Sequence, residues 1–65
     1  MKNKKQIRNA RMEKAYQHMR QGEGMMAMLY VYFANFSYPL SLRQIRHFNK
    51  LVMAQRASKK DIKED

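Results

Sequence analysis

A run of nineteen residues without a charged side chain, from Gly24 to Leu42, constrains this chain more than any other feature. The residues before it hold seven basic and two acidic side chains, and the residues after it hold seven basic and three acidic ones. A chain of 65 residues forms one domain at most, and such a domain buries only about 60% of its unfolded surface. Because cysteine is absent, neither a disulfide nor a thiolate zinc site is available. Further stability has to come from a partner, and a second copy of the chain is the first candidate.

The first basic arm has the pattern of an amphipathic helix, which we predict over residues 5–21. Its apolar face, spaced i, i+3, i+4 and i+7, consists of Met12, Ala15, Tyr16 and Met19. We predict that the glycines at 22 and 24 end this helix, because glycine accepts the left-handed conformation that a C-cap needs.

The apolar segment 25–36 is predicted to form the second helix, buried on all sides. Its apolar side chains cannot be confined to one stripe, and a length of about twelve residues favours a buried helix over a strand. The aromatic and β-branched run Leu29–Phe33 leaves a strand as the alternative. We predict that this helix ends before Pro39, since proline disfavours helix at the residue before it.

A capping box formed by Ser41 and Gln44 predicts the start of a third helix, residues 41–57. Its apolar face consists of Leu42, Ile45, Phe48, Leu51 and Val52, and its polar face of Arg43, Arg46, His47 and Lys50. The segment 58–65 is almost wholly charged and is predicted to be a disordered tail. We therefore predict an all-α fold, with a single helical domain over residues 1–57, a buried central helix, and second and third helices arranged like a helix-turn-helix. We expect this domain to dimerise.

The uncharged run reaches the length of a transmembrane helix, but its composition argues against insertion. Its second half contains Asn35, Ser37 and Pro39, and equal numbers of basic residues flank both ends, so that no orientation is favoured. We predict a cytoplasmic protein that does not cross a membrane. Attachment to an anionic lipid surface through the basic, amphipathic helix 41–57 is the alternative.

The sequence contains no pattern of a catalytic or metal-binding site. Three of the five acidic residues lie in the charged tail, and His18 and His47 lie on different predicted helices. Neither histidine has a ligand-like neighbour at i±4, and we predict that both are solvated. We expect no enzymatic activity, no cofactor and no metal site.

A short turn followed by a basic helix resembles a helix-turn-helix unit, in which the second helix enters the major groove. The predicted contact residues are Arg43, Gln44, Arg46, His47 and Lys50 of the third helix, with Arg11 and Lys14 of the first. Arginine can pair with guanine, and glutamine with adenine. A formal net charge of +9 attracts polyanions. These features predict a small nucleic-acid-binding regulatory protein, a homodimer that favours duplex DNA over RNA.

The alternative is an adaptor or inhibitor that docks a larger protein partner with an acidic surface. Aromatic and methionine side chains are enriched at interface cores. The residues predicted to contact such a partner, or a second copy, are Met25, Met28, Tyr30, Tyr32, Phe33 and Phe36.

Overall fold

The computed structural model describes the backbone of residues 3–63 and the side chains of residues 3–58. In that range the regular structure is α1 (Lys4–Arg20), α2 (Gly24–Ser37) and α3 (Leu42–Lys63). The prediction of an all-α, three-helix fold is confirmed. The strand alternative for Leu29–Phe33 is wrong, because this segment is helical throughout.

The helix ends agree with the predicted ones to within one residue, except at the end of α3. The backbone of α3 continues to Lys63, six residues beyond the predicted end at 57. No glycine or proline follows Pro39, so that this part of the chain lacks the two residues that disfavour helix most. Residues 64 and 65 of the predicted tail lie outside the described residues, and the domain boundary itself stays a prediction.

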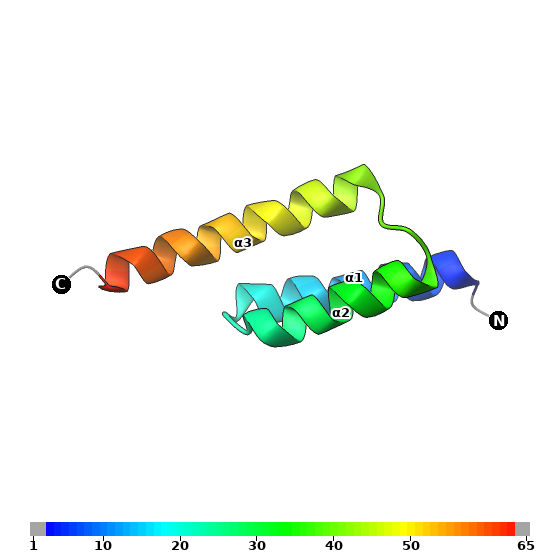
Figure 1. Cartoon of the computed structure of the whole chain (residues 1–65), viewed down its shortest axis with the longest axis horizontal. Helices are drawn as coiled ribbons and strands as arrows, with labels where there is room; N and C mark the ends of the chain where they lie inside the picture. Colours follow the sequence, from blue (N-terminus) through cyan, green and yellow to red (C-terminus); the bar gives the residue numbers. More distant parts are fainter. Residues whose placement is uncertain (1–2, 64–65) are drawn as a thin grey trace.

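The three helices lie side by side along the long axis of the molecule (Figure 1). The Cα atoms extend over 51 × 19 × 14 Å. Helix α2 has 14 residues and a length of about 21 Å, so it cannot lie across either short dimension. The two helices of a helix-turn-helix cross at about 90–120°. Because α2 and α3 instead run in opposite directions along one axis, the predicted helix-turn-helix crossing is not seen.

The hydrophobic core lies around α1, which packs closely along α2 and more lightly against α3. Its buried apolar residues are Met12, Ala15, Tyr16 and Met19 of α1, Ala27 and Ala34 of α2, and Phe48 of α3. The predicted apolar face of the first helix is thus confirmed as a buried face.

The prediction of a buried central helix is wrong for α2. Ala27 and Ala34 are fully buried, but Met25 is 87% exposed and Phe36 is 90% exposed. Helix α2 is apolar on every side, yet it has one closely packed neighbour, so one face is covered and the others stay open. The helix between the other two is α1.

The turn between α1 and α2 is built on Gly22, whose φ of +80° lies in the left-handed region. The N–H of Gly22 donates to the carbonyl of Met19 at 3.1 Å, and the N–H of Glu23 donates to that of His18 at 2.8 Å. This pair of hydrogen bonds is a Schellman motif. The predicted glycine C-cap is confirmed, and it reverses the chain so that α2 returns along α1.

Gly22→Ala is expected to destabilise the protein by about 1–2 kcal/mol, the cost of a left-handed conformation in an L-residue. The cause is backbone strain rather than crowding, because the nearest atom to an added Cβ is Gln55 Oε1 at 3.5 Å. Urea unfolding followed by circular dichroism measures the change. Gly24→Ala is the matched control: an added Cβ there meets no atom within 4 Å, and we expect no loss of stability. Equal losses for both variants would contradict the assignment of strain to Gly22.

Candidate nucleic-acid interface

Helix α3 begins at a capping box, as predicted from the sequence. The N–H of Gln44 donates to Ser41 Oγ at 3.2 Å, and the N–H of Ser41 donates to Gln44 Oε1 at 3.2 Å. These two bonds satisfy backbone donors that a helix start leaves free. They fix the first turn of α3 and therefore the direction in which its basic side chains point.

The basic side chains of α3 lie on the side of the helix that faces away from the core. Phe48, only 7% exposed, marks the inner side, and at 100° per residue the positions 43, 46 and 50 fall roughly opposite to it. Arg43, Arg46, His47 and Lys50 are all exposed. Together with Leu42 they line a shallow cavity of about 460 Å³. We call these four residues the basic arc.

No carboxylate of α3 opposes the basic arc within the described side chains. The segment 42–58 contains four lysine and arginine residues and no aspartate or glutamate. The positive charge of this surface is therefore not neutralised within its own helix over the described side chains, and it attracts an anionic partner.

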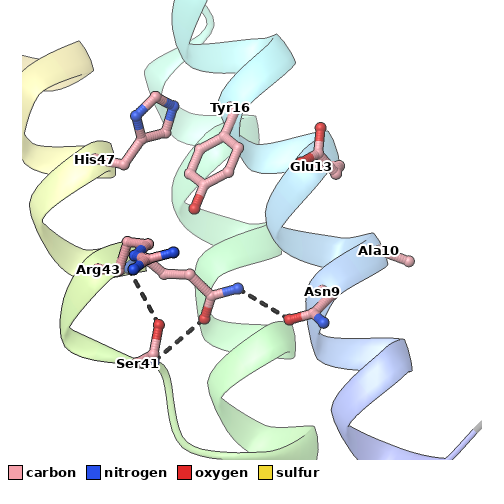
Figure 2. A pocket seen from close by; sticks show the side chains of 8 residues that line it. Asn9, Ala10, Glu13, Tyr16, Ser41, Arg43 and His47 are labelled. Atoms are coloured by element: carbon pink, nitrogen blue, oxygen red, sulfur yellow. Dashed lines mark hydrogen bonds between the residues drawn. The ribbon is translucent and has the colours of Figure 1, made fainter.

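A second cavity, of about 580 Å³, lies between α1 and the first turns of α3. It is lined by Asn9, Ala10, Glu13 and Tyr16 of α1 and by Ser41, Arg43, Gln44 and His47 of α3 (Figure 2). The side-chain amide of Gln44 donates to Asn9 Oδ1 at 3.0 Å and also accepts from Ser41. Gln44 thus joins α3 to α1, and its amide is engaged within the fold.

Tyr16 and His47 meet edge to face in this cleft, with ring centroids 4.5 Å apart and planes at 87°. Figure 2 shows His47 beside the tyrosine ring. Burial, reinforced by the negative charge of Glu13, raises the pKa of the Tyr16 hydroxyl above its ordinary value of 10.0. The hydroxyl therefore stays protonated at neutral pH, and His47 joins this cleft to the basic arc, of which it is a member.

Arg11, a predicted contact residue, is engaged inside the fold. Its guanidinium donates to the carbonyl of Phe33 at 2.8 Å and to Ser37 Oγ at 2.6 Å. These acceptors belong to the last turn of α2, where a positive charge is favourable. Because the chain reverses at Gly22, residue 11 of α1 lies opposite residue 33 of α2. The predicted glycine turn is therefore the sequence feature from which this contact could have been predicted.

Arg8 is likewise held inside the fold. Among the described residues it is the charged residue that is buried, with an exposed fraction of 5%. It donates to the carbonyl of Pro39 at 2.7 Å and to Asn9 Oδ1 at 2.8 Å. Its guanidinium also lies over the ring of Tyr38, 5.1 Å from the centroid. Of the residues predicted on the first helix, only Lys14 is exposed, so α1 presents fewer free cations than its sequence suggests.

His18 is half-buried rather than solvated. Its ring stacks on Tyr30 at a centroid distance of 5.3 Å and an interplanar angle of 11°, and its Nδ1 is hydrogen-bonded to Glu23. The prediction that both histidines are solvated is therefore wrong for His18. The same stack places Tyr30, a predicted interface residue, against α1.

The other predicted interface residues lie in the open. Met25, Tyr32, Phe33 and Phe36 are exposed, and Met28 is exposed to 38%. Met28 lines an apolar groove of about 610 Å³ that α2 forms with Val52 and Arg56 of α3. Leu29, 48% exposed, lies on the same surface and was not predicted, because a helix that is apolar all round does not reveal its outer face.

Within the described residues, no three His, Cys, Asp or Glu side chains are placed to hold a metal ion. None of the helices, over the part of the chain that the structure describes, is long and apolar enough to cross a membrane. No family model, curated protein or solved structure matches the chain.

Proposed function

We propose that this chain is a small regulatory protein that binds nucleic acid through the basic arc of α3. The observation that carries the proposal is the exposure of Arg43, Arg46, His47 and Lys50 on one side of α3, whose segment 42–58 contains no aspartate or glutamate. Such a surface can neutralise several phosphates, and release of the counterions condensed on them supplies much of the affinity.

The shape of α3 favours duplex DNA over RNA as the ligand. The basic arc lies on the side of α3 that faces away from the core, so a nucleic acid can approach the helix from that side. The carboxyl-terminal part of α3 extends beyond the α1–α2 hairpin (Figure 1). The major groove of B-DNA, about 12 Å wide, admits a helix, whereas the deep, narrow major groove of A-form RNA does not. Arg43 and Arg46 are the candidates for base contacts, and Lys50 for a phosphate contact. Gln44 contributes by fixing α3 rather than by contacting adenine.

The double substitution Arg43→Ala/Arg46→Ala is expected to weaken binding to a duplex of about 20 base pairs by roughly 10- to 100-fold near 50 mM salt. The slope of log affinity against log salt counts neutralised phosphates, at about 0.9 for each. Because Arg43 and Arg46 are assigned to base contacts, their loss should change this slope by less than about 0.9. Fluorescence anisotropy of a labelled duplex across a salt series measures both quantities. Circular dichroism checks that the variant stays helical.

Arg56→Ala provides the matched control on the same helix. Arg56 is exposed but lines the apolar groove with α2 rather than the basic arc, so its loss should change affinity by less than about threefold. Equal weakening by both variants would show that charge alone matters and not the basic arc. A folded protein that binds neither DNA nor RNA at about 50 mM salt would contradict the proposal where electrostatic binding is strongest.

The alternative function is that of an adaptor or inhibitor docking a larger protein with an acidic surface. The exposed aromatic and methionine side chains of α2 favour it, since such residues form interface cores. Affinity purification of the tagged chain after nuclease treatment discriminates between the two functions. One protein recovered in stoichiometric amount would support the adaptor, whereas recovery of nucleic acid alone before the treatment, and of nothing after it, would exclude it.

A further inference from the structure

Four large apolar residues form a stripe along the outer face of α2. Met25, Leu29, Tyr32 and Phe36 are 87%, 48%, 64% and 90% exposed. At 100° per residue they gather on the side of α2 opposite Ala27 and Ala34, the two residues buried against α1. We call these four residues the outer stripe. Its side chains stay largely exposed, although Met25, Leu29 and Tyr32 also line the groove that α2 forms with α3.

The spacing of the outer stripe is that of a helix–helix contact. The residues fall at i, i+4, i+7 and i+11, which is the alternation of four and three that forms the seam between paired helices. The intervals read four, three, four from either end. Two such stripes can therefore face each other antiparallel in one register, in which Met25 lies opposite Phe36 and Leu29 lies opposite Tyr32.

We propose that the outer stripe binds the same stripe of a second copy, so that two α2 helices pack antiparallel about a two-fold axis. In a contact with two-fold symmetry, each pair of residues meets twice: the first residue of one copy touches the second residue of the other copy, and the other way round. The register pairs each methionine with a phenylalanine, a favourable contact between thioether and aromatic ring. This inference does not rest on nucleic-acid binding, because none of the stripe residues belongs to the basic arc.

The exposed area of this face matches what a stable dimer needs. With about 200 Å² for each large side chain, the outer stripe exposes roughly 600 Å² per copy. The flanking residues Met26, Met28 and Phe33, exposed to 43%, 38% and 53%, bring this to roughly 800 Å² by the same estimate. Two copies would then bury about 1,600 Å², a standard protein–protein interface.

The charge distribution favours a second copy over an acidic partner as the occupant. No charged residue occurs between Gly24 and Leu42, so two α2 helices meet without placing like charges in contact. Beside the stripe, the guanidinium of Arg11 is already hydrogen-bonded to α2. Arg56 of α3 lines the groove beside the stripe and is exposed, but the stripe itself offers an acidic helix no charge to pair with. Each copy carries a net charge of +9, and salt screens the resulting repulsion between copies.

Sedimentation equilibrium of the nuclease-treated protein over about 1–200 μM tests the inference. We expect a reversible monomer–dimer equilibrium that becomes at least about threefold tighter when salt rises from 0.1 to 0.5 M, since screening weakens the repulsion between copies. Nucleic-acid binding has the opposite salt dependence, because it weakens as salt rises. Failure of the dimer proposal can therefore be told apart from failure of the nucleic-acid proposal. A chain that stays monomeric throughout, or a dimer that weakens with salt, would overturn the inference.

Leu29→Lys should raise the dissociation constant of the dimer by at least about 30-fold, the size of a hot-spot loss. Met53→Lys is the matched control, because Met53 is a 63% exposed apolar residue of α3 outside the stripe. It should change the constant by less than about threefold. Circular dichroism of the two variants checks the helices, which should persist because Leu29 is half-exposed. Equal effects of both substitutions would overturn the assignment of the outer stripe.

Cysteine cross-linking tests the register, and the chain has no cysteine of its own to interfere. A mixture of Met25→Cys and Phe36→Cys proteins should cross-link with a short bismaleimide into a mixed dimer. Met25→Cys alone should not, because the antiparallel register separates the two copies of residue 25 by about 16 Å along the axis. Efficient cross-linking of Met25→Cys to itself would indicate a parallel contact and overturn the proposed register.

Discussion

Phe48→Ala is expected to release α3 from the α1–α2 hairpin and to remove most of the stability of the protein. Phe48 is 7% exposed and is the buried residue that α3 contributes to the core over the described side chains. Truncating a buried phenylalanine costs about 3–5 kcal/mol. A domain of this size rarely has more than about 3–5 kcal/mol in total. The partly buried Leu51 and Val52 would not hold α3 without it.

Urea unfolding of Phe48→Ala, followed by circular dichroism, gives the free-energy change. We expect the cooperative transition to be lost or displaced toward zero denaturant. Met53→Ala serves as the control on the same helix, because Met53 is 63% exposed and exposed substitutions usually change stability by less than about 0.5 kcal/mol. If Phe48→Ala unfolded at the same urea concentration as the unaltered protein, the assignment of Phe48 as the anchor of α3 would be wrong.

The double substitution Ala27→Leu/Ala34→Leu is expected to separate α2 from α1. Both alanines are fully buried, and their small side chains let the two helices approach closely. Each substitution adds three carbon atoms at a fully buried contact, and overpacking of this kind costs about 1–3 kcal/mol. The two positions are seven residues apart, about 10 Å along the helix, so their effects should add to roughly 2–6 kcal/mol.

Thermal unfolding of the double variant measures this loss against a control of identical chemistry. Ala54→Leu makes the same change at an exposed position of α3 and should leave stability within about 0.5 kcal/mol. Leucine and alanine both favour helix, so a loss in the double variant cannot be ascribed to helix propensity. Unchanged stability of the double variant would mean that α1 and α2 are not in close contact at these alanines.

The sequence predicted the helices well because the signals that begin and end them are local. The apolar spacing of α1, the left-handed Gly22 and the Ser41–Gln44 capping box each act over a few residues, and each is found where it was predicted. The exposed positions of the basic arc followed from the same logic. Once Phe48 faces the core, the helical period places Arg43, Arg46 and Lys50 on the far side.

The side-chain partners of charged residues were not predicted, because they depend on which helices become neighbours. Arg11 and Lys14 are alike in the sequence, yet Arg11 binds the last turn of α2 while Lys14 is exposed. Gln44 is a candidate for base contacts in the sequence, but in the fold it is hydrogen-bonded to Asn9, 35 residues away.

By itself, the sequence determined the number of helices and all of their limits except the end of α3. It also determined the inner face of α1 and the basic side of α3. The tertiary structure decided which helix lies in the middle and which face of α2 is open. An amphipathic helix such as α1 specifies its own buried face. Helix α2 is apolar on every side, so its own pattern favours no face, and its orientation is set by Ala27 and Ala34, the small residues on which α1 can pack closely. For the same reason its outer stripe is left exposed.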